Sequence, residues 1–416
     1  MSNSLNNVFS WYSRTSLILR IIAGMIIGTI LGVTVPKIEA IYLLGDFFVG
    51  ALKAIAPVLV FFLVTSSLIR GRESLGGKFR LVIWLYVIST LCASVLSVVA
   101  SFLFPISLTL PAAGTSGAAP EGIGEVLKNV LIGMISNPLV SISEGRYLGI
   151  LFWAAVLGLA MKGIASETTK QFLHDCADGV SKIVKWIIGF APFGILGLVY
   201  NNVSTNGVSF FSEYAGLLAL LVGTMLFVAL VANPLIVFIM LRKNPYPLVY
   251  KCLKESGVTA FFTRSSAANI PLNMELCRHL KLDEEVYSVS IPLGATINMS
   301  GAAVTITIFV LAAVNTLGIS VDVPSAILLS FMSAVGACGA SGVAGGSLLL
   351  IPMACALFGI DQNTAMQVVG VGFIVGVVQD SFETAINSSS DALFAATAEY
   401  SQWKKEGKPL PEELFS

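Results

Sequence analysis

Acidic side chains occur close together near the C-terminal end of the chain, within a stretch that is otherwise apolar. Asp380, Glu383 and Asp391 all lie in the segment VGVVQDSFETAINSSSDALF, residues 375–394. A charged side chain costs at least about 2.5–3.5 kcal/mol at the centre of a bilayer, and such residues usually serve function. We therefore expect these carboxylates to bind a ligand.

The spacing of the polar residues predicts how they are presented. Asp380, Thr384, Asn387 and Asp391 follow one another at intervals of four, three and four residues. On an α-helix this spacing places them on one face, with Glu383 beside them. Carboxylate and carboxamide oxygens suit a small cation or an ammonium group, and without His or Cys they are poor ligands for Fe, Cu or Zn. The stripe therefore predicts a cation and amine site.

Arg264 is the internal cation that could pair with this stripe, and either Asp380 or Glu383 could be its partner. If all three acids ionise, one arginine leaves two of the three negative charges uncompensated. A buried charge without a partner is strongly destabilising. We therefore expect the empty site to attract cations, either before the substrate or together with it.

The composition indicates the class of protein that holds these residues in place. Of the 416 residues 56% are hydrophobic and 12% are charged, against about 25% charged in soluble domains. The formal net charge is zero, so nothing indicates a nucleic-acid partner. The six cysteines have no CxxC spacing and are interpreted as small hydrophobic residues. We predict a membrane protein that contacts the lipid bilayer and has no organic cofactor.

Apolar stretches long enough to cross a hydrocarbon core of about 30 Å occur eight times. They cover residues 16–36, 42–69, 80–104, 128–161, 180–200, 213–241, 284–315 and 363–398. Proline disfavours a continuous helix, so we expect Asn137-Pro138 to divide the fourth stretch and Pro192 to kink the fifth.

Two further apolar stretches, 252–276 and 324–357, are interrupted by TRSSAANIP and GACGASGVAGGS. Each is typical of a re-entrant hairpin. Non-helical backbone at membrane depth must be buried in protein or line a wet cavity, so both tips should face a site. The predicted fold class is an all-α polytopic membrane protein with eight transmembrane helices plus two re-entrant helical hairpins, a pattern that points to a secondary transporter.

Lysine and arginine gather in alternate connections, which by the positive-inside rule places both termini in the cytoplasm. The first hairpin then enters from the cytoplasm and the second from outside. The residues that define the cytoplasmic side are Arg14, Arg70, Arg72, Lys78, Arg80, Lys162, Lys170, Lys182, Lys185, Arg242, Lys243, Lys251, Lys254, Arg278, Lys281, Lys404, Lys405 and Lys408.

The seventh stretch contains IPLGATINMSGAAVT, in which Gly294, Asn298, Met299, Ser300 and Gly301 crowd together. Glycine and asparagine lower helix propensity, and an unwound turn would free carbonyl oxygens for a cation. Small residues are also common where membrane helices pack, so the pattern alone leaves packing as an alternative.

Several motifs in order resemble the dicarboxylate/amino-acid:cation symporter family of glutamate-transporter-like carriers, over nearly the whole chain. They are LKAIAPVLVFFLVTSSL, NPLVSISEGRYLGILFWAAVLGLAM, KIVKWIIGFAPFGILGLV, TRSSAANIP, PLGATINMSG, the Gly-rich second hairpin and the D…N…D stripe. Within the family the chain is most similar to bacterial carriers of serine and threonine. The resemblance implies sodium-coupled import of these small neutral amino acids by an elevator mechanism, in a homotrimer of the bacterial inner membrane.

The resemblance also implies roles for individual residues. The substrate carboxylate falls on Ser265 and Ser266, and the substrate ammonium group falls on Asp380. The predicted substrate site comprises Arg264, Ser265, Ser266, Asp380, Glu383, Thr384 and Asn387. One sodium site falls on Gly294, Asn298, Asn387 and Asp391, and a second falls near Thr296, Met299, Ala337, Cys338 and Ala340.

Two departures from the family pattern bear on specificity and coupling. Carriers of acidic amino acids have an arginine where this chain has Glu383. A carboxylate there would repel glutamate and could accept a hydrogen bond from a substrate hydroxyl, although a cationic substrate remains an alternative. The family's NMDGT is NMSGA here, so Ser300 stands where the family has the aspartate of a third sodium site, and Tyr86, Ser89 and Thr90 align with the rest of that site. We therefore expect fewer coupled sodium ions than in the acidic carriers.

The resemblance further implies a scaffold, residues 14–70 and 128–200, and a transport part, residues 80–104 and 213–398, with the second hairpin as external gate. The alternative within transport is a proton-coupled or acidic amino acid/dicarboxylate symporter. A channel would conduct without substrate. An intramembrane hydrolase is disfavoured because the sequence has no GxSxG motif, and no enzyme activity is expected.

Overall fold

The computed structural model describes residues 15–35, 38–69, 77–110, 128, 131–207, 210–340, 345–411 and 414–415. Arg14, Arg70 and Arg72, residues 111–127 and part of the second hairpin tip (341–344) lie outside these ranges. Within them every regular element is a helix. The chain therefore has the predicted all-α architecture wherever the structure describes it.

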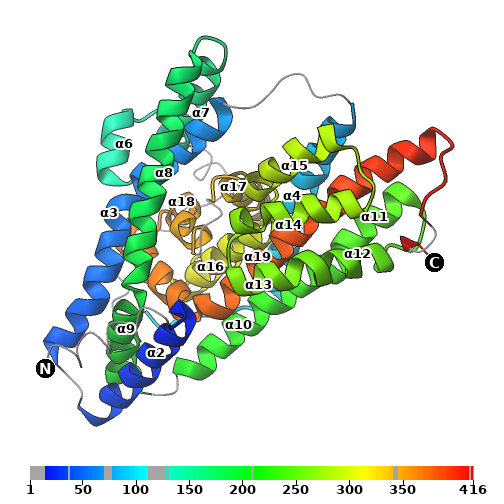
Figure 1. Cartoon of the computed structure of the whole chain (residues 1–416). Helices are drawn as coiled ribbons and strands as arrows, with labels where there is room; N and C mark the ends of the chain where they lie inside the picture. Colours follow the sequence, from blue (N-terminus) through cyan, green and yellow to red (C-terminus); the bar gives the residue numbers. More distant parts are fainter. Residues whose placement is uncertain are drawn as a thin grey trace, which may run out of the picture.

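One group of helices lies along the left of Figure 1 and packs mainly within itself. α3 contacts α7, α8 and α9, and α2 lies along α9. Glycine permits the close approach of α2 to α9, since a Cβ atom on Gly28 would lie 2.6 Å from the carbonyl oxygen of Leu196. The members are α2 (Leu17–Thr34), α3 (Glu39–Ile69), α6 (Pro138–Glu144), α7 (Tyr147–Lys162), α8 (Glu167–Gly189) and α9 (Ala191–Asn206).

A second group surrounds the long helix α19 (Gln362–Lys405). Two of its units are helix–turn–helix pairs, which we call the first and second hairpins. The first hairpin consists of α12 (Tyr246–Cys252), a π-helical segment (Leu253–Gly257), α13 (Val258–Thr263) and α14 (Ser266–His279). The second consists of α17 (Val323–Ala337), a 3-10 turn (Ser347–Leu350), α18 (Ile351–Cys355) and a 3-10 turn (Ala356–Phe358). The other members are α4 (Gly77–Leu103), α10 (Phe210–Phe227), a π-helical segment (Val228–Ala232), α11 (Asn233–Leu241), α15 (Glu284–Ile297) and α16 (Ser300–Thr316).

The fourth apolar stretch is divided at the predicted Asn137-Pro138 and then again. The side chain of Asn137 accepts hydrogen bonds from the N–H groups of Leu139 and Val140 and so begins α6. Gly145, in a left-handed conformation with φ 65°, ends α6 a few residues later. The prediction of a break is confirmed, but the second break was not predicted.

The fifth stretch is longer than predicted and bent. α8 begins at Glu167, thirteen residues before the predicted start at 180. The prediction missed this part because charged side chains on the other face of the helix lower its mean hydropathy. α8 and α9 meet at an angle of 54°. Pro192 lies in the first turn of α9, where a missing N–H costs no hydrogen bond. The predicted kink at Pro192 is thus confirmed.

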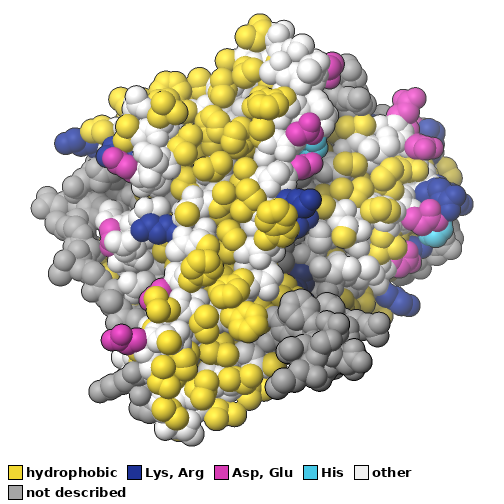
Figure 2. Space-filling model, turned by 60° about the vertical axis from the view of Figure 1, so that its left-hand side comes forward, with side chains coloured by type: hydrophobic (Ala, Val, Ile, Leu, Met, Phe, Trp, Pro, Cys, Tyr) yellow, Lys and Arg dark blue, Asp and Glu magenta, His cyan; other side chains and the backbone are white. Residues whose placement is uncertain are grey.

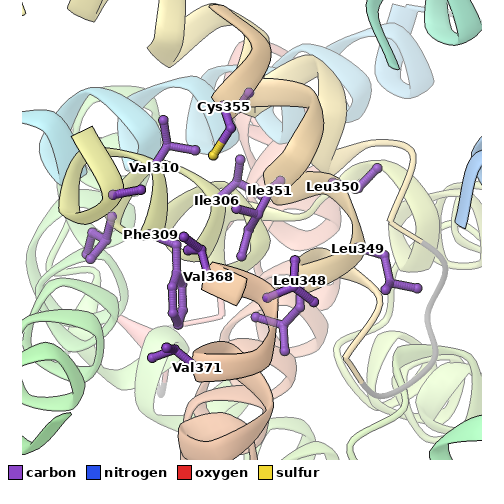
Figure 3. Packing of buried hydrophobic residues seen from close by; sticks show 14 of the residues in the cluster. Ile306, Phe309, Val310, Leu348, Leu349, Leu350, Ile351, Cys355, Val368 and Val371 are labelled. Atoms are coloured by element: carbon purple, nitrogen blue, oxygen red, sulfur yellow. The ribbon is translucent and has the colours of Figure 1, made fainter. Parts of the chain in front are cut away.

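The apolar core lies between α16, α19 and the second hairpin. Figure 3 shows Ile306, Phe309 and Val310 of α16 near Leu348 and Ile351 of the second hairpin and near side chains of α19. Every residue of α16 from 300 to 314 is buried. α16 is therefore an inner helix, and it can hold polar side chains away from lipid.

The outer surface is apolar, as a bilayer requires. Within the described ranges, five helical stretches are long and apolar enough to cross a membrane: α3, α4, α10–α11, α15–α16 and α19, with the bent pair α8–α9 as a sixth. α2 and α7 are apolar but shorter in their described parts. Hydrophobic side chains are spread over much of the described face in Figure 2. Large hydrophobic side chains such as Ile26 and Phe47 are exposed. These features define a multi-pass membrane protein.

Candidate functional site

α19 carries the predicted polar stripe at the centre of the second group of helices. Asp380, Glu383, Thr384, Asn387 and Asp391 are all buried, with exposed fractions between 1% and 6%. α19 contacts the first hairpin, both α15 and α16, and α18 of the second hairpin. The single polar face expected from the spacing therefore exists, and it is enclosed by the elements that were expected to face it.

Asp380 lies between the two hairpin turns. Its Oδ2 atom is 3.8 Å from Nη1 of Arg264, and its Oδ1 atom accepts a hydrogen bond of 3.2 Å from the N–H of Gly345. Arg264 occupies the turn between α13 and α14 with φ 50°, an uncommon conformation for a residue with a side chain. Of the two partners considered for Arg264, the structure selects Asp380.

Glu383 is held by three protein donors at a single oxygen. Its Oε2 atom accepts from Thr305 Oγ1 at 2.7 Å, from Ser347 Oγ at 2.8 Å and from Gln379 Nε2 at 2.5 Å. Gln379 also donates to Thr305 Oγ1 at 2.7 Å. These contacts tie α16 and the second hairpin to α19. Thr305, Ser347, Gln379 and Gly345 were not among the site residues predicted from the sequence.

The helix of the seventh stretch is interrupted where predicted. Asn298 and Met299 separate α15 from α16 and have non-helical ψ angles of 75° and 48°. Asn298 Nδ2 donates to Oδ1 of Asp391 at 2.8 Å, and the N–H of Gly301 donates to Oδ1 of Asn387 at 2.7 Å. The unwound turn is therefore confirmed, and it is hydrogen-bonded to the end of the polar stripe, at Asn387 and Asp391.

Two buried carboxylate or carboxamide oxygens beside this turn have no hydrogen-bond partner among the described residues. They are Oδ2 of Asp391 and Oδ1 of Asn298. Gly294 permits the close approach of the Asp391 carboxylate and of Tyr86, since a Cβ atom there would lie 2.6 Å from Oδ1 of Asp391 and 3.0 Å from Cζ of Tyr86. Leaving buried acceptors unpaired costs free energy, which a bound cation would recover.

The other predicted residues lie at the ends of neighbouring elements. Ser265 begins α14, where its side chain accepts from the N–H of Ala268 at 3.2 Å, and Ser266 is buried in the first turn. Cys338 Sγ donates to the carbonyl of Ile297 at 3.4 Å, which brings the end of α17 to the unwound turn. Ala337 and Ala340 are buried beside Cys338, Met299 is buried in the unwound turn, and Thr296 Oγ1 donates to the carbonyl of Leu293 at 2.8 Å.

The side chains that align with the family's third sodium site donate to protein acceptors. Tyr86 Oη donates to the carbonyls of Ser290 at 3.3 Å and Asp391 at 3.2 Å. Ser89 Oγ donates to Asn233 Oδ1 at 2.8 Å, and Thr90 Oγ1 donates to the carbonyl of Tyr86 at 2.9 Å. Ser300 Oγ is buried and has no partner among the described residues. Position 300 therefore has a hydroxyl group where the carriers that this chain resembles have a carboxylate.

A multi-pass helical protein with buried carboxylates, an unwound helix and two hairpins around them is the kind of structure that secondary transporters use. The model of the sodium:dicarboxylate symporter family matches residues 17–401, and the chain belongs to this family. The chain is 57% identical over 416 residues to the serine/threonine transporter SstT of Bifidobacterium adolescentis, covering 100% of this chain and 97% of the relative. It is 57% identical over 402 residues to SstT of Streptococcus thermophilus, and 58% identical over 397 residues to SstT of Streptococcus agalactiae. These alignments cover 96% and 95% of this chain, and 100% and 98% of the respective relatives.

Proposed function

We propose that this chain imports serine and threonine together with sodium across the bacterial inner membrane. The observation that carries the proposal is the pair of buried carboxylates, Asp380 and Glu383, that face the hairpins without a second arginine among the described residues around them. The carboxylate of Asp380 suits the ammonium group that every amino acid carries. The carboxylate of Glu383 repels an acidic side chain and accepts a hydrogen bond from a substrate hydroxyl.

The substrate site consists of Arg264, Ser265, Ser266, Asp380, Glu383, Thr384 and Asn387. Both oxygens of Asp380 already have neighbours, since Arg264 lies by one and the N–H of Gly345 binds the other. Oδ2 of Asp380 accepts no hydrogen bond from the described residues, so it is the oxygen that a substrate ammonium group can bind. The contact of Gly345 with Asp380 joins the second hairpin to the substrate site, which supports its role as the external gate.

A first sodium site at Gly294, Asn298, Asn387 and Asp391 is supported by the two unpaired oxygens beside the unwound turn. Oxygen ligands of this kind suit a hard cation. A second site near Thr296, Met299, Ala337, Cys338 and Ala340 is supported by the contact of Cys338 with the last turn of α15. The third site lacks its carboxylate because position 300 is serine, so we propose two coupled sodium ions.

Alternating access in this proposal is an elevator movement of the helices around α19 against the group that contains α3. The packing of α2, α3 and α7–α9 with one another supports a separate scaffold, residues 14–70 and 128–200, against a transport part, residues 80–104 and 213–398. Eight transmembrane helices plus two re-entrant hairpins, cytoplasmic termini and a homotrimer complete the proposal.

Equilibrium binding tests the substrate assignment. Purified protein would be titrated with serine, threonine and glutamate by calorimetry, in sodium buffer and in choline buffer. We expect serine and threonine to bind in sodium only, and glutamate to bind in neither buffer. Glutamate binding that exceeds serine binding would instead favour the acidic-substrate carrier, and binding of serine in choline at low pH would favour proton coupling.

A further inference from the structure

An apolar groove lies away from the polar stripe, between α4 and α10. Its volume is about 590 Å³ and its lining is apolar except for Thr224. Lining residues of α4 and α10 include Leu96, Val99, Leu103, Ala219, Gly223 and Phe227. Glycine helps to form this groove, because a Cβ atom on Gly223 would have open space around it.

The groove has the length of one membrane leaflet. Its lining on α10 extends from Gly216 to Phe227, which is about 16 Å at 1.5 Å per residue. This is roughly half of a hydrocarbon core of ~30 Å. Lys78, at the opposite end of α4, belongs to the cytoplasmic side by the positive-inside rule, so the groove lies in the outer half of the membrane.

A smaller, more polar hollow of about 210 Å³ adjoins the groove. Ile106 and Leu220 line both hollows. The smaller one also contains Ser101 and Asn315, near the outer ends of α4 and α16. Ser101 is 8% exposed, and its Oγ atom has no hydrogen-bond partner among the described residues. A buried hydroxyl without a partner indicates a missing polar ligand.

We propose that the two hollows together bind a glycerol-ester lipid of the outer leaflet. One acyl chain fills the groove between α4 and α10, and an ester or hydroxyl oxygen of the glycerol backbone binds Ser101. The neighbouring Asn315 Nδ2 donates to the carbonyl of Ile106 at 3.1 Å and to Ser107 Oγ at 3.3 Å. No charged side chain lines either hollow within the described ranges, so the part of the lipid that is recognised is uncharged. A diacylglycerol and the backbone of a phospholipid share this chemistry.

Photo-crosslinking tests the site on the full-length protein in nanodiscs. The probes are a diacylglycerol and a phosphatidylglycerol, each with a diazirine in the middle of one acyl chain, and mass spectrometry locates the adducts. We expect adducts on residues 96–106 and 216–227 in excess over the equally apolar exposed face of α2. Adducts from both probes indicate a phospholipid, and adducts from diacylglycerol alone indicate a neutral lipid.

Variants test the two halves of the site separately. Gly223→Leu fills the groove and should lower the adduct yield at least about fivefold, and Ser101→Ala should lower it about twofold to threefold. The matched control is Gly50→Leu, at an exposed position of α3 where a Cβ atom meets nothing within 4 Å. If Gly223→Leu does not fold, the distribution of adducts over the unchanged protein decides whether a lipid binds in the groove. Adducts spread evenly over the apolar surface would overturn the proposal.

Discussion

Asn298 and Asp391 are 93 positions apart in the chain, and Nδ2 of Asn298 donates a hydrogen bond of 2.8 Å to Oδ1 of Asp391. The same asparagine donates to Ser390 Oγ at 2.7 Å and to the carbonyl of Asn387 at 3.2 Å. These contacts fix the unwound turn against α19. They leave Oδ2 of Asp391 and Oδ1 of Asn298 as acceptors for a cation.

Replacing Asp391 by asparagine should weaken sodium binding. The variant keeps the shape of the side chain but removes the negative charge beside the unwound turn, and we expect the sodium affinity to fall at least about tenfold. Sodium dependence of serine binding would be measured by calorimetry. Asp178→Asn on α8, where the side chain is 70% exposed, is the matched control and should change nothing. An unchanged sodium affinity in Asp391→Asn would remove this residue from the site.

Adding one methyl group at Gly294 should act on the same site by crowding. In Gly294→Ala the new Cβ atom would lie 2.6 Å from Oδ1 of Asp391, so the carboxylate must shift. We expect weaker sodium binding, with serine binding restored at high sodium concentration. Gly179→Ala, in the middle of α8 with no atom within 4 Å of the new Cβ, is the control. Equal sodium titrations for both variants would contradict the placement of the cation.

Asp380→Asn should abolish serine binding at any sodium concentration. The substitution removes the partner of the substrate ammonium group and also leaves Arg264 without its buried counter-ion. The double variant Asp380→Asn, Arg264→Gln removes the unpaired charge, so it should regain thermal stability but not serine binding. Binding by the double variant with near-normal affinity would show that another group holds the ammonium.

Glu383→Gln should relax the exclusion of acidic substrates. Glutamine keeps an acceptor oxygen for Thr305 and Ser347 but removes the negative charge. Glutamate should then compete with serine about tenfold more strongly, because the like-charge repulsion is gone. Competition by glutamate against labelled serine measures this directly. Equal exclusion of glutamate by the variant and the unchanged protein would mean that position 383 does not set the selectivity.

Gly28→Ala tests the packing of the scaffold rather than the site. The new Cβ atom would lie 2.6 Å from the carbonyl oxygen of Leu196, so α2 must move away from α9. Overpacking of this kind costs typically about 1–3 kcal/mol of stability. Thermal unfolding followed by fluorescence should show a lower midpoint than for Gly50→Ala, whose Cβ atom has open space. Matching midpoints would contradict the close contact of the two helices.

The sequence predicted the local features of this molecule well, because each depends on neighbouring residues. The polar stripe of α19 follows from helical periodicity, and the break at Asn298 follows from poor helix formers in an apolar run. The start of α8 at Glu167 was missed because hydropathy alone does not detect an amphipathic helix end.

The contacts that complete the site could not be read from the sequence. Gln379 is four residues before Glu383, so its contact follows from helical spacing and could have been found. Thr305 and Ser347 reach the same oxygen from distant elements, which only tertiary packing brings together. For the same reason the sequence left two partners open for Arg264, and the fold selects Asp380.

Coupled flux of the two solutes tests the central proposal most directly. Proteoliposomes carrying the purified protein would be loaded without sodium and exposed to ²²Na⁺ and tritiated serine together, with uptake of both labels followed in the same vesicles. We predict that serine enters only with sodium, that added serine accelerates sodium entry, and that both fluxes are lost in Asp380→Asn. Serine uptake at an equal rate in choline, with no sodium entry, would contradict the account.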